Sequence, residues 1–171
     1  MIMWRYPEMT IATPQRNSTG PFTLIREHQR SYPIDVEALS QDFGLSIVKK
    51  DWPDEVSGAI GQDDRGYFIV VNAKHSETRQ RFTIAHEIAH YILHRDRIGK
   101  EGIKDSWLYR STKMSDADER AANKLAAEIL MPADMLGKAA LAVGGLEDLS
   151  KLARELHVSK TALAIRLGVP T

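Results

Sequence analysis

The chain has 171 residues, of which 43% are hydrophobic and 27% are charged, as is typical of a globular protein with one main domain. Lysine plus arginine equals aspartate plus glutamate at 23 each, which argues against strong nonspecific binding to nucleic acid or to an anionic membrane. Cysteine is absent, so disulfides, thiolate metal ligands and cysteine nucleophiles are excluded.

Residues 1–20 mix proline, serine, threonine and glycine with scattered apolar residues, which predicts a flexible N-terminal extension. This stretch has no continuous apolar segment, so it does not resemble a secretory signal. Nowhere does the sequence contain the roughly 18 consecutive apolar residues that a membrane-spanning helix needs. We therefore expect a cytoplasmic protein with no membrane partner.

Two short helices are expected next, one starting at Pro21 and one that is capped by Asp35 and ends at Gly44. Three segments rich in β-branched or aromatic residues follow, separated by turn formers. These segments span residues 45–50, 56–61 and 66–72. The polar stretch between the last two suits a hairpin. The sequence predicts an α+β fold with a small, mainly antiparallel three-stranded sheet.

A long helix is predicted to begin at Ser76, because apolar residues then recur at helical spacing. The polar linker over residues 97–115 is long enough for a loop or lid that faces a substrate. A second long helix is capped by Ser115 and ends at Met131, where a proline follows. Three shorter helices complete the predicted elements.

The first long helix contains an H-E-x-x-H motif, His86-Glu87-Ile88-Ala89-His90. Residues four apart lie on one face of an α-helix, so the imidazoles of His86 and His90 can bind one ion. Glu87 is rotated away from that face and lies close to the position of a metal-bound water. It is therefore the candidate general base of a zinc-dependent hydrolase.

A catalytic zinc takes three protein ligands and keeps one open position, so the motif needs a third ligand. His94 is on the same helix, but an unbroken helix places it about 12 Å along the axis from His86. The three histidines cannot easily reach one ion. We therefore interpret His94 as a residue that lines the site, orients a ligand, or lies on the surface.

The second long helix offers an alternative, because Glu119 and Asn123 are four residues apart and share a face. This is the gluzincin arrangement, in which thermolysin-like enzymes have Glu as the metal ligand and, four residues later, Asp as the residue that orients a ligand histidine. Here Glu119 is the candidate ligand, and Asn123 would orient the histidine with a neutral side-chain carbonyl. Competing acidic residues on the same helix are Asp116, Asp118 and Glu128.

Two blocks of sequence carry a resemblance to a known family. They are RFTIAHEIAHYILH at residues 81–94 and ERAANKLAAEILMP at residues 119–132. In this order they resemble the ImmA/IrrE family of metallopeptidases, whose members show R-F-T-x-A-H-E-[LI]-x-H and then E-x-x-A-N-x-x-A-x-x-[LI]-L-M-P. One departure is Leu125, where the family commonly has phenylalanine.

The resemblance implies a zinc cofactor, an α+β peptidase core with zincin-type helices, and a base at Glu87. It implies metal ligands at His86, His90 and Glu119. We accordingly predict a zincin-like metallopeptidase domain over residues 21–142.

Residues 143–171 are predicted to form a helical tail that packs on this domain. LSKLARELHVSKTALAIRLG resembles a helix-turn-helix, with His157 where such motifs often carry glycine. Few basic residues lie on its second helix, so we expect weak DNA binding or none, and a packing or substrate-docking role.

Two classes of function remain open. By resemblance, the first is an intracellular endopeptidase whose substrate is a helix-turn-helix repressor or an antitoxin. The second is a regulatory protein without proteolytic activity, which keeps the zincin fold but binds DNA or a partner as part of a toxin-antitoxin pair.

Overall fold

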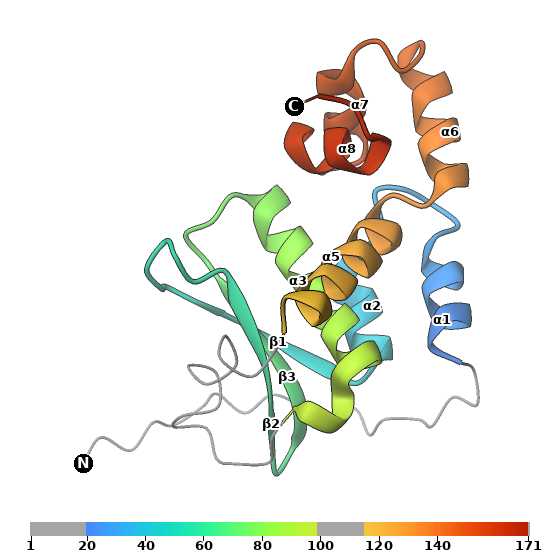
Figure 1. Ribbon diagram of the computed structural model, residues 1–171. Coiled ribbons are helices and arrows are strands. Elements are labelled where there is room, and N and C mark those ends of the chain that lie inside the picture. Colours follow the sequence, from blue (N-terminus) through green and yellow to red (C-terminus); the bar gives the residue numbers. More distant parts are fainter. Residues whose placement is uncertain (1–19, 99–114, 171) are drawn as a thin grey trace.

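The computed structural model describes residues 20–98 and 115–170. The predictions for the N-terminal extension and for most of the 97–115 linker fall outside these residues. The described residues form seven α-helices: α1 (Pro21–His28), α2 (Val36–Asp42), α3 (Glu77–His94), α5 (Asp116–Leu130), α6 (Ala133–Val143), α7 (Leu149–Glu155) and α8 (Lys160–Leu167). They also form three strands: β1 (Leu45–Lys50), β2 (Gly58–Asp63) and β3 (Gly66–Asn72). Figure 1 shows the arrangement, which confirms the α+β prediction.

The sheet has the strand order β1-β3-β2 and is mixed. The β2–β3 hairpin is antiparallel, as expected, but β1 pairs with β3 in parallel, so the mainly antiparallel prediction is corrected. The reason is that the connection between β1 and β2 crosses to the far edge of the sheet. Strand β2 also begins two residues later than predicted, at Gly58.

The side chain of Asn72 holds that connection in place. Its amide nitrogen donates to the carbonyl oxygens of Trp52, Pro53 and Val56 at 3.2, 3.0 and 2.9 Å. Its amide oxygen accepts from the backbone N–H of Trp52 at 3.3 Å. Asn72 is fully buried, and these bonds satisfy backbone groups that would otherwise disfavour the crossing.

The helix starts follow from their capping residues. Asp35 accepts from two backbone N–H groups at the start of α2, and Ser76 accepts from one in the first turn of α3. At α5, Ser115 and Asp118 form a reciprocal capping box, which satisfies two N–H groups that have no partner within the helix. The predicted caps at Asp35, Ser76 and Ser115 are therefore confirmed.

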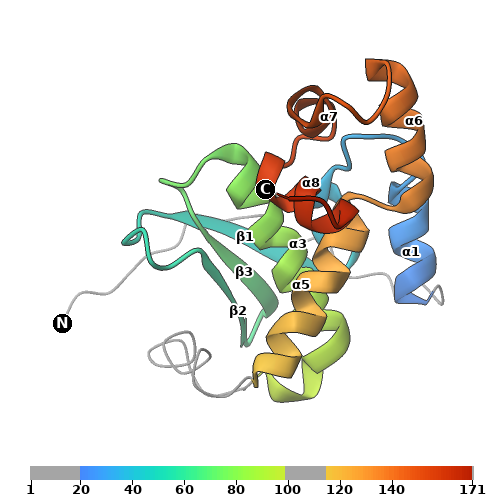
Figure 2. The ribbon, with the colours of Figure 1, turned by 45° about the horizontal axis from the view of Figure 1, so that its top comes forward.

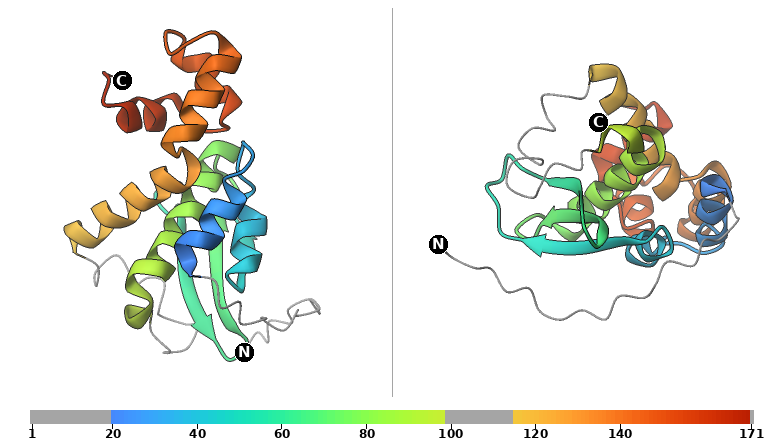
Figure 3. Two further views of the ribbon diagram at one scale, coloured as in Figure 1. Left: turned by 90° about the vertical axis from the view of Figure 1, so that its right-hand side faces the viewer. Right: turned by 90° about the horizontal axis from the view of Figure 1, so that it is seen from below.

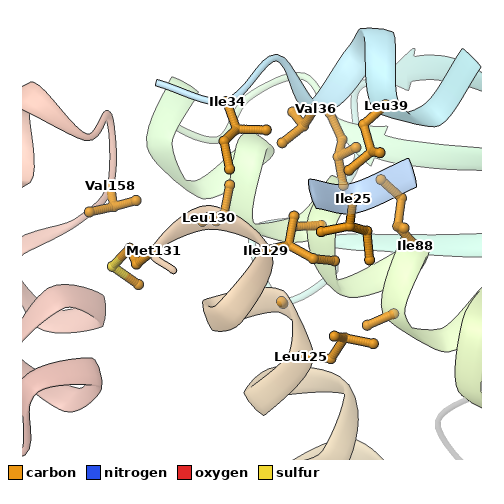
Figure 4. Close-up of a cluster of buried hydrophobic side chains, with 14 of the residues drawn as sticks. Ile25, Ile34, Val36, Leu39, Ile88, Leu125, Ile129, Leu130, Met131 and Val158 are labelled. Carbon is orange, nitrogen blue, oxygen red and sulfur yellow. The ribbon is translucent and has the colours of Figure 1, made fainter. Parts of the chain in front are cut away.

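Helix α3 runs across one face of the sheet, against β2 and β3, and α5 packs along α3 (Figures 2 and 3). The helices meet in an apolar core. Figure 4 shows Ile25 of α1, Ile88 of α3, and Leu125 and Ile129 of α5 in one cluster. Full burial of such a side chain contributes about 1.5–3 kcal/mol, so this core fixes α5 against the helix that carries the H-E-x-x-H motif.

The C-terminal helices α6, α7 and α8 gather at the end of the molecule away from the sheet (Figure 1). The predicted turn between α7 and α8 is present, and His157 there has a φ of 51°, the left-handed conformation that favours glycine. Arg81 of α3 donates to the His157 carbonyl at 3.3 Å, and Arg166 of α8 donates to the Met131 carbonyl at 3.2 Å. The tail therefore contacts the rest of the protein through buried and polar groups. Among the described helices, none has the length and apolar character to cross a membrane.

Gly58→Ala should weaken the packing of β2 against α3. A Cβ atom at this position would clash with the Thr83 side chain and lie 2.7 Å from the Val70 carbonyl oxygen. We expect a loss of about 1–3 kcal/mol in the free energy of unfolding, measured by urea denaturation. Gly137→Ala in α6 is the matched control, since nothing lies within 4 Å of its Cβ position. It should stabilise by roughly 0.5–1 kcal/mol, and equal effects of both changes would contradict the packing described.

Candidate metal centre

Three side chains from two helices converge at one point. His86 and His90 lie one turn apart on α3, and Glu119 lies in the first turn of α5. The Nε2 atoms of His86 and His90 are 3.0 Å apart. Carboxylate oxygens of Glu119 lie 3.3 Å from His86 Nε2 and 3.4 Å from His90 Nε2. The structure thus brings together the three residues that the sequence pattern singled out as ligands.

The spacing of these three donor groups suits a metal ion. Ligand atoms held about 2.0–2.1 Å from a tetrahedral zinc ion lie about 3.3–3.4 Å from one another. The separations of 3.0, 3.3 and 3.4 Å come close to these values. Of the competing acidic residues, neither Asp116, Asp118 nor Glu128 belongs to this cluster. The His-His-Glu group can therefore hold a metal ion.

The side chain of Asn123 lies against the imidazole of His86. Its side-chain carbonyl oxygen lies 3.0 Å from His86 Nδ1, one turn after Glu119 on the same face of α5. A carbonyl only accepts, so the hydrogen bond places the His86 proton on Nδ1. In the neutral imidazole this leaves the Nε2 lone pair facing His90 and Glu119.

His94 is buried, with 7% of its surface exposed, so the surface interpretation of this residue is wrong. Its Nδ1 lies 3.1 Å from His90 Nδ1, on the side of His90 away from the cluster. Its Nε2 lies 3.2 Å from a carboxylate oxygen of Asp118. Both ring nitrogens of His94 thus face other side chains, and it is not a member of the three-residue cluster.

Asp118 is held as a carboxylate by several donors. The Ser115 hydroxyl and backbone N–H lie 2.7 and 2.9 Å from its Oδ2, and Arg97 donates to the same oxygen at 2.7 Å. The hydrogen bonds from Ser115, followed by Arg97, lower the pKa of Asp118 to about 2. Asp118 is therefore a fixed negative acceptor at the start of α5.

Glu87 is buried on α3, directly after His86, with 5% of its surface exposed. Glutamate is seldom buried to this degree, and burial among functional groups is typical of sites that carry chemistry. The side chain of Glu119 remains 43% exposed, so the cluster is reachable from outside on that side. The site therefore combines a buried carboxylate, Glu87, with a His-His-Glu cluster that is partly exposed.

Phe82 is a neighbour of the site that the sequence analysis did not identify. Its ring stacks on the His86 imidazole, with 6.5 Å between centroids and an angle of 28° between planes. The sequence does contain a pattern that predicts this contact, because Phe82 and His86 are four residues apart on one helix and side chains at that spacing are neighbours. The stacking adds an apolar wall to the His86 side of the cluster.

A surface depression lies away from the metal cluster. It has a volume of about 520 Å³ and is lined by residues around α1 and the start of α6: Arg26, Gln29, Arg30, Pro132, Asp134 and Lys138. None of these residues belongs to the metal cluster. The candidate chemistry is therefore at the junction of α3 and α5 rather than in this depression.

Known proteins share both the sequence and the fold. Residues 40–168 match the IrrE N-terminal-like domain, a peptidase family. The radiation response metalloprotease IrrE of Deinococcus deserti is 34% identical over 121 residues, which are 65% of this chain and 42% of that protein. The radiation response metalloprotease IrrE of Deinococcus radiodurans is 35% identical over 130 residues, or 74% of this chain and 37% of that protein. The chain therefore spans less than half the length of these relatives.

A solved structure of a Mycobacterium tuberculosis transcriptional regulator shares the fold, with a TM-score of 0.57 and 20% identity. The alignment covers 87% of this chain and 46% of that one. The matched family region includes every residue of the metal cluster together with Glu87, His94 and Asn123. Since the family match extends over most of the sequence, the chain belongs to the ImmA/IrrE family of metallopeptidases.

Proposed function

We propose that this chain is a zinc-dependent endopeptidase that acts in the cytoplasm. The observation that carries the proposal is the convergence of three electron-pair donors, from His86, His90 and Glu119, within 3.0–3.4 Å of one another. A carboxylate and ring nitrogens without protons repel one another unless a cation lies between them. Two imidazoles and one carboxylate are the ligand set that catalytic zinc uses in peptidases.

Each residue of the site has a distinct role in this proposal. His86, His90 and Glu119 bind the ion, and Asn123 keeps the proton of His86 on Nδ1. Zinc bound here supplies Lewis-acid polarisation of a peptide carbonyl. Glu87 takes a proton from the attacking water and delivers it to the leaving nitrogen.

The substrate class follows from the family resemblance, and we propose a helix-turn-helix repressor or an antitoxin. The 43% exposure of the Glu119 side chain would let an extended peptide segment of such a protein reach the cluster. The names of the two Deinococcus relatives describe metalloproteases of a radiation response. A stress-linked regulatory protease is the function that these features support best.

DNA binding by the C-terminal helices is less well supported. Helix α8 carries the two basic residues Lys160 and Arg166, and Arg166 donates to the Met131 carbonyl within the protein. The exposed Ile165 on the same helix has no role in contacting phosphates. These contacts favour a packing or docking role for α7 and α8.

The test is co-expression of the full chain with a helix-turn-helix regulator, of the substrate class proposed above, taken from the same genome. Mass spectrometry of the regulator should show two fragments with the wild-type protein, and only intact regulator with Glu87→Gln. Glu128→Gln, an exposed carboxylate change on α5, serves as the control and should leave cleavage unchanged. Intact regulator in the presence of zinc-loaded wild type, with repression unaffected by Glu87→Gln, would instead support the non-proteolytic alternative.

A further inference from the structure

Three buried or fixed side chains extend from the metal cluster to the start of α5. His90, with 2% of its side chain exposed, points Nε2 at His86 and Glu119 and points Nδ1 at His94. The two Nδ1 atoms are 3.1 Å apart, and His94 Nε2 lies 3.2 Å from Asp118 Oδ1. We call these residues the His90–His94–Asp118 triad.

When both imidazoles are neutral, only one placement of their two protons gives every contact in the triad a donor and an acceptor. A neutral imidazole carries one N–H donor and one acceptor, so one proton lies between the two Nδ1 atoms. If it belonged to His94, then His94 Nε2 would be unprotonated and would face the Asp118 carboxylate, and two acceptors would repel. If it belongs to His90, then His94 Nε2 carries a proton and donates it to Asp118. The second arrangement satisfies every group.

The same arrangement prepares His90 to bind metal. With its proton on Nδ1, His90 presents the Nε2 lone pair toward His86 and Glu119. Asp118 accepts from His94 at the other end of the triad, and two donors from Ser115 and one from Arg97 hold its carboxylate in place. The triad therefore connects the orientation of His90 to the cap of α5, the helix turn that also carries Glu119.

We propose that His94 is a positioning residue that fixes the tautomer and the ring orientation of His90, with Asp118 as the terminal acceptor. The inference rests on the proposed metal site and assigns to it a second supporting partner. His86 has a different partner at its Nδ1, the exposed and neutral side-chain carbonyl of Asn123. The buried ligand is thus oriented through a carboxylate, and the more accessible ligand through an amide. Loss of such outer partners typically costs roughly 10–100-fold in metal affinity.

The test is zinc affinity, measured by competition with a chromophoric chelator on the full chain. His94→Leu removes the acceptor and should weaken zinc binding by roughly 10–100-fold. His94→Asn places a side-chain carbonyl near the position of Nδ1 and should restore most of the affinity. Leu93→Ala, a change at an exposed side chain of α3 that belongs to neither the triad nor the metal cluster, is the control and should bind zinc like the wild type.

A second readout is the tautomeric state of the rings in zinc-loaded wild-type protein, from long-range ¹H–¹⁵N spectra. The proposal requires a proton on Nδ1 of His90 and on Nε2 of His94. A proton on Nδ1 of His94, or equal affinity for His94→Leu and the wild type, would overturn it. So would equal weakening by His94→Leu and His94→Asn, because the role would then be packing. Wild-type protein that binds no zinc would instead refute the proposed function itself.

Discussion

Glu87→Gln should leave zinc bound and lower the rate of peptide-bond cleavage by about 10²–10⁴-fold, the usual contribution of a general base. The amide has nearly the same shape as the carboxylate, so the buried position on α3 remains filled. It cannot accept a proton from the attacking water. The measurement is the single-turnover cleavage rate of the regulator, together with zinc content by mass spectrometry.

Slow cleavage by Glu87→Gln identifies the base only if the variant is folded and holds zinc. Thermal unfolding of Glu87→Gln should match the wild type within a few degrees, and the zinc content should be unchanged. Cleavage at the wild-type rate by this variant would show that Glu87 is not the base. Loss of zinc together with cleavage would show that Glu87 acts on the metal rather than on water.

Glu119→Ala should reduce zinc affinity by more than the roughly 10–100-fold expected for an outer partner, because it removes one of three direct ligands. Two imidazoles on one helix then remain without the carboxylate that joins them to α5. Zinc-dependent stabilisation should also shrink, since a ligand that binds only the folded state stabilises it by an amount that grows with the logarithm of its concentration over its dissociation constant. Chelator competition and thermal unfolding with and without zinc measure both effects.

The control for this prediction is Asp116→Ala. Asp116 is an exposed acid in the same helical turn, so its removal changes the charge equally without touching the cluster. Zinc affinity should remain at the wild-type level. If Asp116→Ala weakened zinc binding as much as Glu119→Ala, the effect would be one of local charge or helix stability, and Glu119 would not be a ligand.

Local features of the fold could be predicted from the sequence because their causes are local. Asp35, Ser76 and Ser115 cap helices through bonds to residues at most three positions away. The convergence of His86 and His90 follows from helix geometry, and Glu119 and Asn123 share a face for the same reason. That the two pairs meet across two helices could be predicted only from the E-x-x-x-N spacing and the family resemblance.

Features that depend on long-range contacts could not be predicted in the same way. The parallel pairing of β1 with β3 requires a segment that crosses the sheet. The buried side-chain amide of Asn72 holds this segment, but no local sequence pattern distinguishes Asn72 from other polar residues. The role of His94 could not be predicted from the sequence, because it depends on the contact of its side chain with Asp118. Asp118 lies 24 positions later, and only the packing of α5 on α3 brings it within 3.2 Å.

The most direct test of the metal centre is a crystal structure of the zinc-loaded protein with data at the zinc absorption edge. We expect one anomalous peak about 2.0–2.2 Å from Nε2 of His86, Nε2 of His90 and a carboxylate oxygen of Glu119. A peak at other residues, or density at this site without anomalous signal in protein that contains stoichiometric zinc, would contradict the assignment.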